Sequence, residues 1–235
     1  EWERAHYHQA AARAYGVDVD EKPGRVTVSA DVGLVAPSVQ PALHGRLLWS
    51  LTDDGVLSLG MRLRRTLGFP SLPRLGLRLF LPESMSQVDY YGLGPQESYV
   101  DKRRASHHGA FSAEVVDLHE DYIRPQENGS HADCNKVIVS GGGLSLAVVG
   151  PTPFSFNASR YTQEELAARH RNTDLTPSGS TVLCLDAAMA GIGSNSCGPA
   201  LRPRYQVDSQ ELGMELHLLL NPLVSHTSTH NEVTL

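Results

Sequence analysis

The chain is poor in cysteine and contains no long hydrophobic run. Its three cysteines, Cys134, Cys184 and Cys197, are an odd number and lie far apart. Such a set excludes a disulfide framework and fits a reducing compartment, so we expect a cytoplasmic protein. No apolar stretch approaches the roughly 20 residues that span a bilayer, and the polar residues 1–15 do not form a signal peptide. We therefore expect no membrane partner.

Basic charge and aromatic side chains are also scarce. The formal net charge is −6, and no run of Lys or Arg could follow a phosphate backbone, so we expect no nucleic-acid partner. Arg62, Arg64 and Arg65 lie close together among apolar residues, which is typical of the exposed face of a strand. Aromatic residues make up 6% of the chain. Core packing is the expected use for most of them.

The sequence is rich in alternating apolar and polar residues. Arg25–Val32 places valines on one face and Thr, Ser and Asp on the other, as a half-buried strand does. Asp54-Gly55, between two such runs, is a strong hairpin signal. Turn residues follow at the short intervals expected of a β-sandwich. Further predicted strands are Leu43–Leu51, Val56–Leu63, Leu75–Leu81, Ala113–Leu118, Lys136–Ser140, Leu144–Val149, Thr181–Ala188, Tyr205–Val207 and Met214–Leu220.

These patterns predict one nearly all-β domain over residues 1–220, because no repeat and no linker divides it. Residues 221–235 are predicted to be a loose tail, since the alternation stops at Leu220 and Ser, Thr and His follow. One helix is predicted, from Thr162 to Asn172. Thr162 and Glu165 form a capping-box pattern, in which the Thr hydroxyl accepts an early backbone N–H and the Glu reaches back.

The titratable residues offer no obvious catalytic or metal site. The chain has 11 histidines, but His107 and His108 would point to opposite faces of a strand, and no Cys-x-x-Cys pair is present. We expect no metal site. Several carboxylates lie in or near distinctive segments, but their spacing does not place two of them across a cleft. Glu97 and Glu127 are predicted to be structural, accepting backbone N–H bonds in glycine-containing turns.

Several uncommon sequence blocks occur in a fixed order along the chain. The first combines two glycines and a proline between tyrosines, which alone predicts a tight turn. Together the blocks resemble the C-terminal, small-chain domain of the large bacterial β-galactosidases of glycoside hydrolase family 2, from near Trp2 to about Leu220. The blocks are Tyr90–Tyr99, Arg124–Gly129, Phe154–Tyr161, Met189–Gly193 and the loop around Pro199.

The resemblance implies a fold, an activity and the location of the catalytic residues in another domain. The fold would be a large two-sheet antiparallel supersandwich, as in galactose mutarotases. The parent enzyme would hydrolyse terminal β-D-galactosides with retention, using two glutamates in a barrel domain outside this chain. We therefore expect no catalytic residue here and an inactive isolated domain, which packs on the barrel within a homo-oligomer. The magnesium and sodium ions typical of the family would bind in other domains.

The loop after Gly191-Ile192-Gly193 is the expected point of contact with substrate. In the family it reaches the mouth of the active site and commonly presents a tryptophan to the aglycone sugar. The matching residue here is Cys197, which offers no aromatic face. The predicted substrate-binding residues are Cys197, Asn195 and Ser196, which would contact a β-galactoside at the active-site rim.

Two other functions are compatible with a β-sandwich. An autonomous carbohydrate-binding module would need an exposed aromatic platform. A stand-alone aldose epimerase-like enzyme would need a histidine and a carboxylate that converge in a concave sheet. The sequence alone identifies neither arrangement.

Overall fold

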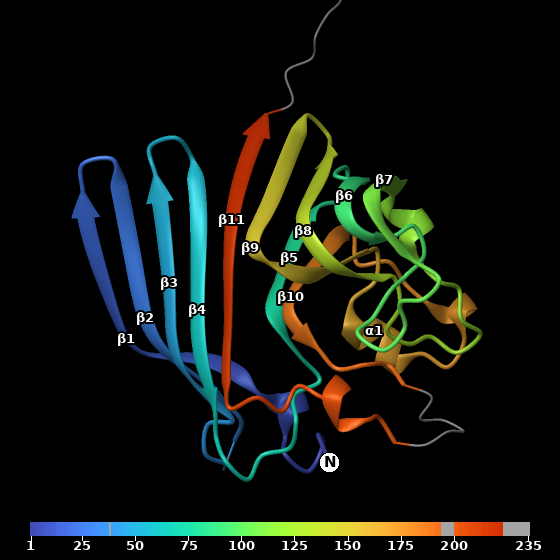
Figure 1. Cartoon of the computed structure of the whole chain (residues 1–235), viewed down its shortest axis with the longest axis horizontal. Coiled ribbons are helices and arrows are strands. Elements are labelled where there is room, and N and C mark those ends of the chain that lie inside the picture. The colour runs from blue at the N-terminus through green and yellow to red at the C-terminus, as the bar shows by residue number, and fades with distance from the viewer. Residues whose placement is uncertain (38, 194–199, 223–235) are drawn as a thin grey trace, which may run out of the picture.

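A computed structural model describes residues 1–37, 39–193 and 200–222 of the chain (Figure 1). Almost all regular structure is antiparallel β-strand, and the one α-helix, α1, has 6 residues. This confirms the predicted all-β class with one short helix. The elements are 3-10 helix Tyr7–Gln9, β1 Ala11–Lys22, β2 Arg25–Val35, β3 Leu43–Thr52, β4 Val56–Arg65, β5 Arg74–Pro82, β6 Gln87–Gly94, β7 His107–Glu114, 3-10 helix Val115–Leu118, β8 Ser130–Gly141, β9 Leu144–Ser159, α1 Gln163–Ala168, 3-10 helix Asn172–Asp174, β10 Ser180–Met189, 3-10 helix Pro203–Tyr205 and β11 Glu211–Pro222.

The long strand β9 joins two layers of one hydrogen-bonded sheet. Its first half, Leu144–Val149, pairs with β11, whereas its second half pairs with β10. The strand changes partner around Gly150, Pro151 and Pro153, where proline lacks the backbone N–H that a ladder needs. One layer has the strand order β1-β2-β3-β4-β11-β9-β8-β6-β7, and β10 with β5 continues the sheet from the second half of β9. The two layers of the sandwich are thus parts of a single sheet.

The hydrophobic core lies between these layers. Leu59 of β4 and Leu216 of β11 belong to the same buried cluster as Leu183 and Leu185 of β10. Figure 1 shows β5 and β10 behind β11, β9 and β8, whereas β1, β2 and β3 extend beyond them. No helix among the described residues is long and apolar enough to span a membrane.

Three strands were not predicted, and two predicted strands are wrong. Strands β1, β6 and β7 lack a long alternating apolar run. The predicted turn at the Gly92–Pro95 block begins only after β6, which runs through Gly94. A Cβ on Gly92 would lie 2.2 Å from the Cys134 sulfur, so glycine allows β6 to approach β8. The predicted strand Ala113–Leu118 ends at Glu114. The predicted strand Tyr205–Val207 does not form: Tyr205 ends the 3-10 helix Pro203–Tyr205, and Val207 makes only an isolated bridge with Leu72.

The helix and the tail also differ from their predicted limits. Helix α1 ends at Ala168, four positions before the predicted Asn172. The Thr162 hydroxyl accepts a hydrogen bond from the Glu165 N–H at 3.1 Å, as predicted. The Glu165 carboxylate does not reach back: it binds Arg169 and the Thr176 N–H. Strand β11 continues to Pro222, and residues 223–235 of the predicted tail lie outside the described residues.

A buried histidine in β8 links folding to pH. His131 is 1% exposed, and its Nδ1 lies 3.2 Å from the Leu93 carbonyl oxygen and 3.1 Å from the Tyr90 hydroxyl. Its ring stacks on Phe156. Burial lowers the pKa of His131 to about 4, from about 6.5 in an unfolded chain. The unfolded state therefore takes up the proton first as the pH falls. The resulting stability is complete above about pH 6.5 and is lost between about pH 6.5 and 4.

We predict that His131→Gln weakens this pH dependence. The free energy of unfolding of the wild-type chain should fall by about 2 kcal/mol more than that of the variant between pH 7 and pH 4.5, as one buried neutral histidine requires. Urea unfolding followed by fluorescence at the two pH values measures the difference. An equal loss in both proteins would show that His131 is not the group responsible.

Candidate functional site

The root of the predicted substrate-binding loop is held by an aspartate from a distant segment. Asn195, Ser196 and Cys197 themselves lie outside the described residues, but the chain is described up to Gly193. The Asp101 carboxylate accepts hydrogen bonds from the Ile192 N–H at 3.1 Å and the Gly193 N–H at 2.7 Å. The Gly191 N–H donates to the Tyr205 carbonyl at 2.9 Å. The segment that leads into the loop is therefore fixed at Gly191, Ile192 and Gly193.

Glycine at position 191 makes this attachment possible. A Cβ there would lie 2.5 Å from the Asp101 carboxyl carbon and 2.6 Å from one of its oxygens, which is too close for any other side chain. Asp101 lies two positions after the Tyr90–Tyr99 block. Two blocks that are far apart in the sequence thus meet at one carboxylate. The sequence did not single out Asp101, because its role comes only from the tertiary contact.

Glu97 organises the segment that carries Asp101. Its carboxylate accepts the Gly129 N–H at 2.8 Å and the Tyr122 hydroxyl at 2.5 Å, and it pairs with the Lys102 ammonium group. Burial alone would raise the pKa of Glu97, but the donors from Lys102, Tyr122 and Gly129 outweigh it and hold the pKa below its ordinary value. The predicted structural role of Glu97, accepting a backbone N–H in a glycine-containing turn, is confirmed.

The predicted role of Glu127 is wrong. Its carboxylate binds the Arg74 guanidinium at 3.1 Å and not a backbone N–H. Arg74 also donates to both carboxylate oxygens of Asp186, at 3.0 and 2.5 Å. Burial raises the pKa of Glu127, and the Arg74 charge opposes that rise. Arg74 of β5 and Asp186 of β10 thus tie the second layer to the Glu127 loop, and neither residue was predicted.

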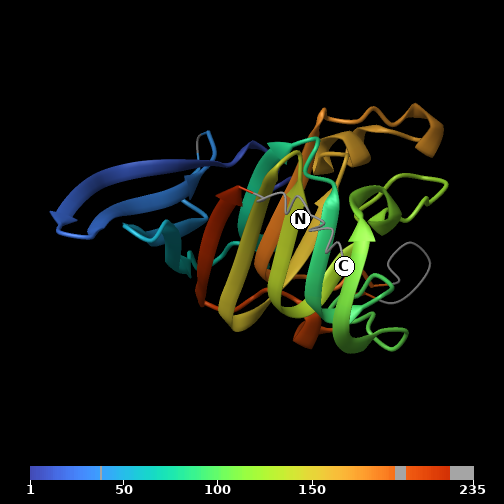
Figure 2. The ribbon, with the colours of Figure 1, turned by 90° about the horizontal axis from the view of Figure 1, so that it is seen from above.

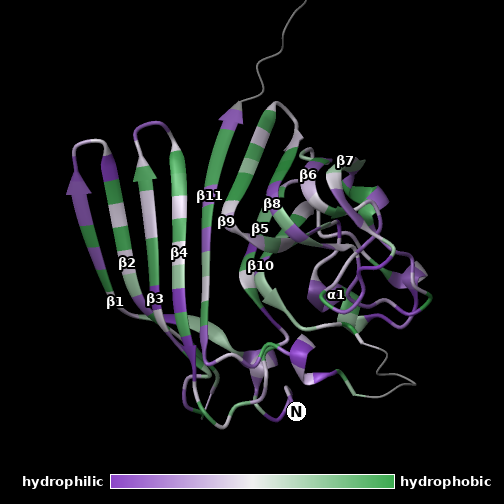
Figure 3. Cartoon of the chain, in the orientation of Figure 1, coloured by the Kyte–Doolittle hydropathy of each residue, from purple (hydrophilic) through white to green (hydrophobic). Residues whose placement is uncertain are grey.

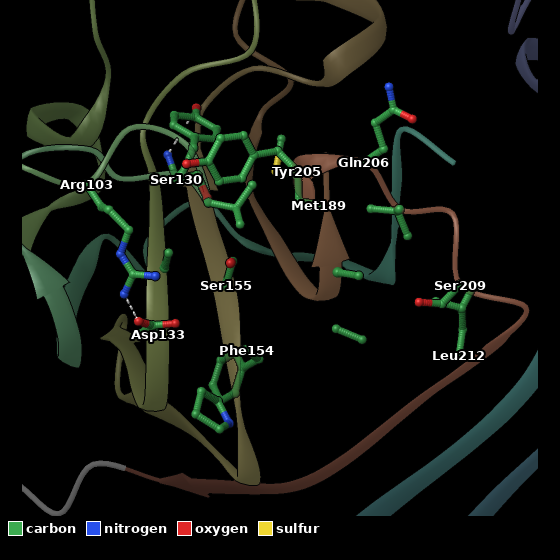
Figure 4. Close-up of a pocket in the computed structure, with 17 residues that line it drawn as sticks. Arg103, Ser130, Asp133, Phe154, Ser155, Met189, Tyr205, Gln206, Ser209 and Leu212 are labelled. Carbon is green, nitrogen blue, oxygen red and sulfur yellow. Dashed lines mark hydrogen bonds and ion pairs between the residues drawn. The ribbon is translucent and has the colours of Figure 1, made fainter. Parts of the chain in front are cut away.

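A cavity of about 280 Å³ lies beside the loop root (Figure 4). Arg103 and Asp133 form an ion pair on one side of it, and Tyr205 and Gln206 line another. The Ser130 hydroxyl also lines the cavity and has no hydrogen-bond partner. The cavity is slightly smaller than ordinary small-molecule pockets of about 300–1,000 Å³. It therefore has room for one small polar group or part of a sugar.

The lining of this cavity does not provide acid–base chemistry. Among the described residues it contains no histidine, and its single carboxylate, Asp133, is paired with Arg103. The half-buried Glu127 and the buried Asp186 are both held by Arg74, so they are not two free carboxylates that face each other as in a glycosidase. Nor do three His, Cys, Asp or Glu side chains converge on a possible metal position anywhere in the described ranges.

The exposed aromatic side chains of the described residues are dispersed. Tyr15 lies on β1 beneath Arg13, and Phe80 lies on β5 beneath Arg78. Tyr91 of β6 contacts His108 edge to face. Each of these aromatic rings lies on a different strand and already has a neighbour. They therefore do not form a shared flat platform for a sugar ring.

The fold and the site define an all-β domain whose described residues fix the 191–193 segment and do not form a catalytic pair. The chain matches the family described as "Beta galactosidase small chain" over residues 1–220. It is 36% identical to a β-galactosidase of Actinobacillus pleuropneumoniae over 95% of this chain, and 35% identical to one of Staphylococcus xylosus over 93%. The chain belongs to the β-galactosidase small-chain family. It spans only 22% of the length of either relative.

Two solved structures are similar in fold. They are a putative aldose 1-epimerase from Escherichia coli K12, with a TM-score of 0.44, and a GalM/aldose epimerase homologue from Caenorhabditis elegans, with a TM-score of 0.46. Each is 10% identical in sequence, and each comparison covers 88% of this chain and 69% of the other.

We predict that Asp101→Ala releases the loop root. Without the carboxylate, the Ile192 and Gly193 amides lose their acceptor and should exchange their hydrogens at least about tenfold faster. Asp101→Asn should cause a smaller change, because its amide oxygen can still accept one hydrogen bond. Hydrogen exchange with mass spectrometry measures both variants, and Asp18→Ala, at an exposed position of β1, is the control. Unchanged exchange at these amides in Asp101→Ala would contradict the assignment.

Proposed function

We propose that this chain is the C-terminal domain of a β-galactosidase that hydrolyses terminal β-D-galactosides with retention. The observation that carries the proposal is the family membership across residues 1–220, together with relatives named β-galactosidase. Because the chain spans about a fifth of those relatives, the remaining polypeptide has room for a catalytic barrel. The two catalytic glutamates would lie in that barrel, and this domain would pack against it.

The role proposed for this domain is to complete the rim of the active site. Asp101 and Tyr205 fix the root of the 194–199 loop, so the loop would extend from a rigid base. Asn195 and Ser196 would offer hydrogen bonds to sugar hydroxyls. Cys197 would stand where the family commonly has tryptophan, and the aglycone would then lack an aromatic stacking surface. This predicts that the site accepts aglycones of different structure.

The remaining parts of the proposal concern the whole enzyme. It would be a cytoplasmic homo-oligomer, and its magnesium and sodium ions would bind outside this domain. The two other candidate functions have less support. The cavity beside the loop root carries no histidine with a free carboxylate, as an epimerase would need. The dispersed exposed aromatics do not suit an autonomous carbohydrate-binding module.

We predict that the isolated chain does not hydrolyse galactosides. A nitrophenyl β-galactoside should be turned over by the longer polypeptide and not by residues 1–235, because retaining hydrolysis needs two opposed carboxylates. The measurement is absorbance of released nitrophenol, with the longer polypeptide as positive control. Turnover by the pure chain that disappears on mutating one of its own carboxylates would contradict the proposal.

We predict that Cys197 is the cysteine that reports on ligand. Cys134 and Cys184 are buried, and burial raises the pKa of each to about 12, so both should react slowly with a thiol reagent. Cys197 should be labelled first, and a galactoside bound to the longer polypeptide should slow its labelling. Mass spectrometry of labelled peptides measures each site separately.

Cys197→Trp provides a second test of the same loop. It should change the preference for aglycone or acceptor without abolishing hydrolysis, since it alters the rim and leaves the catalytic pair unchanged. Steady-state kinetics with two aglycones measures the change. If Cys197 is labelled at the same rate with and without ligand, and this variant has unchanged kinetics, then Cys197 does not contact the substrate.

A further inference from the structure

The strands β1 to β4, here called the wing, continue the apolar face of the core into a region that no layer among the described residues covers. Directly paired residues of antiparallel strands point to the same face of a sheet. One such row runs Leu216, Leu59, Trp49, Val28 and Val19 across β11, β4, β3, β2 and β1. Leu216 is 0% exposed, Leu59 1% and Val19 58%. The same row therefore passes from complete burial to a side chain that is more than half exposed.

The two neighbouring rows behave in the same way. Met61 of β4 is buried, whereas Val17 at the β1 end of its row is exposed. Leu218 of β11 is buried, whereas Val26 in its row is exposed. Hydrophobic residues alternate along β2 in Figure 3. The exposed and half-exposed members are here called the wing apolar face: Val17, Val19, Val26, Val28, Ala30, Leu47, Trp49, Leu51 and Leu57. Leu47, Trp49 and Leu57 also pack against the edge of the core, so the uncovered part lies mainly on β1 and β2.

The opposite face of the wing is mainly polar, although it includes the exposed Leu48, which pairs with Ser29. Its rows pair Asp18 with Ser29, and Thr27 with Ser50. The wing is thus amphipathic, as a sheet packed on one side is. The layer that covers the core, β5 with β10, ends before β1 and β2 (Figure 1), and Figure 2 shows the β1–β2 hairpin projecting away from the rest of the chain. The apolar side has no layer of its own among the described residues.

We propose that the wing apolar face is covered by a segment of the same polypeptide outside residues 1–235. This inference rests on the proposed function, which makes the chain part of a longer enzyme. Relatives that match 93–95% of this chain carry it as 22% of a single polypeptide, so a covering segment is present at fixed stoichiometry. Burial of such a patch is the strongest general driving force for packing. A second copy of this chain is the competing occupant.

The test compares the two faces of one strand. Val19→Cys places a thiol on the wing apolar face, and Asp18→Cys places the matched control on the polar face of the same strand. Both variants are made in the 1–235 chain and in the longer polypeptide, and labelling is read by mass spectrometry at the peptide that carries each position. Galactosidase activity and sedimentation are measured on the same samples.

We expect Cys at position 19 to react at least about tenfold more slowly in the longer polypeptide than in the isolated chain, because a packed thiol reacts only through local opening. Cys at position 18 should react alike in both. Equal reactivity at position 19, or protection confined to position 18, would overturn the inference. Protection at position 19 in a dimer of the isolated chain would assign the face to a second copy instead. If the unsubstituted longer polypeptide has no galactosidase activity while position 19 is still protected in its Val19→Cys form, the proposed enzyme is rejected and the covered face stands.

Discussion

The architecture depends on the change of pairing partner along β9. Because its two halves pair with different strands, one sheet becomes two layers, and the apolar faces of those layers close on each other. Everything that positions the candidate site follows from this fold. Arg74 of β5 and Asp186 of β10 meet in the second layer, and the end of β10 leads directly into the 190–193 segment. The loop root is therefore attached to a largely buried strand.

The site is held by carboxylates that bind the domain's own groups. Glu97 gathers the Lys102, Tyr122 and Gly129 donors, and Asp101 holds the Ile192 and Gly193 amides. Hydrogen bonds to ionised groups are stronger than neutral ones, so these links hold the 191–193 segment firmly. The Glu97 and Asp101 carboxylates therefore serve to position other groups of the domain. This distribution fits a domain that shapes a site whose chemistry is done by another domain.

Part of this structure could be predicted from the sequence, for identifiable reasons. Alternation at Val26 and Val28 predicted a strand, and Thr162 predicted the start of α1, because both signals are local. The sequence could not assign Glu127, since its partner Arg74 lies 53 positions away. Asp101 is one of 26 acidic residues, and only the tertiary contact at Gly191 distinguishes it. The family resemblance pointed to the loop at 194–199, but not to the residues that hold it.

The most direct measurement is galactosidase activity of the longer polypeptide with residues 1–235 present, deleted, and added back as a separate chain. If this domain completes the active-site rim, deletion should reduce kcat/KM strongly, and the added chain should restore part of it. Full activity after deletion, with the same aglycone preference, would contradict the account.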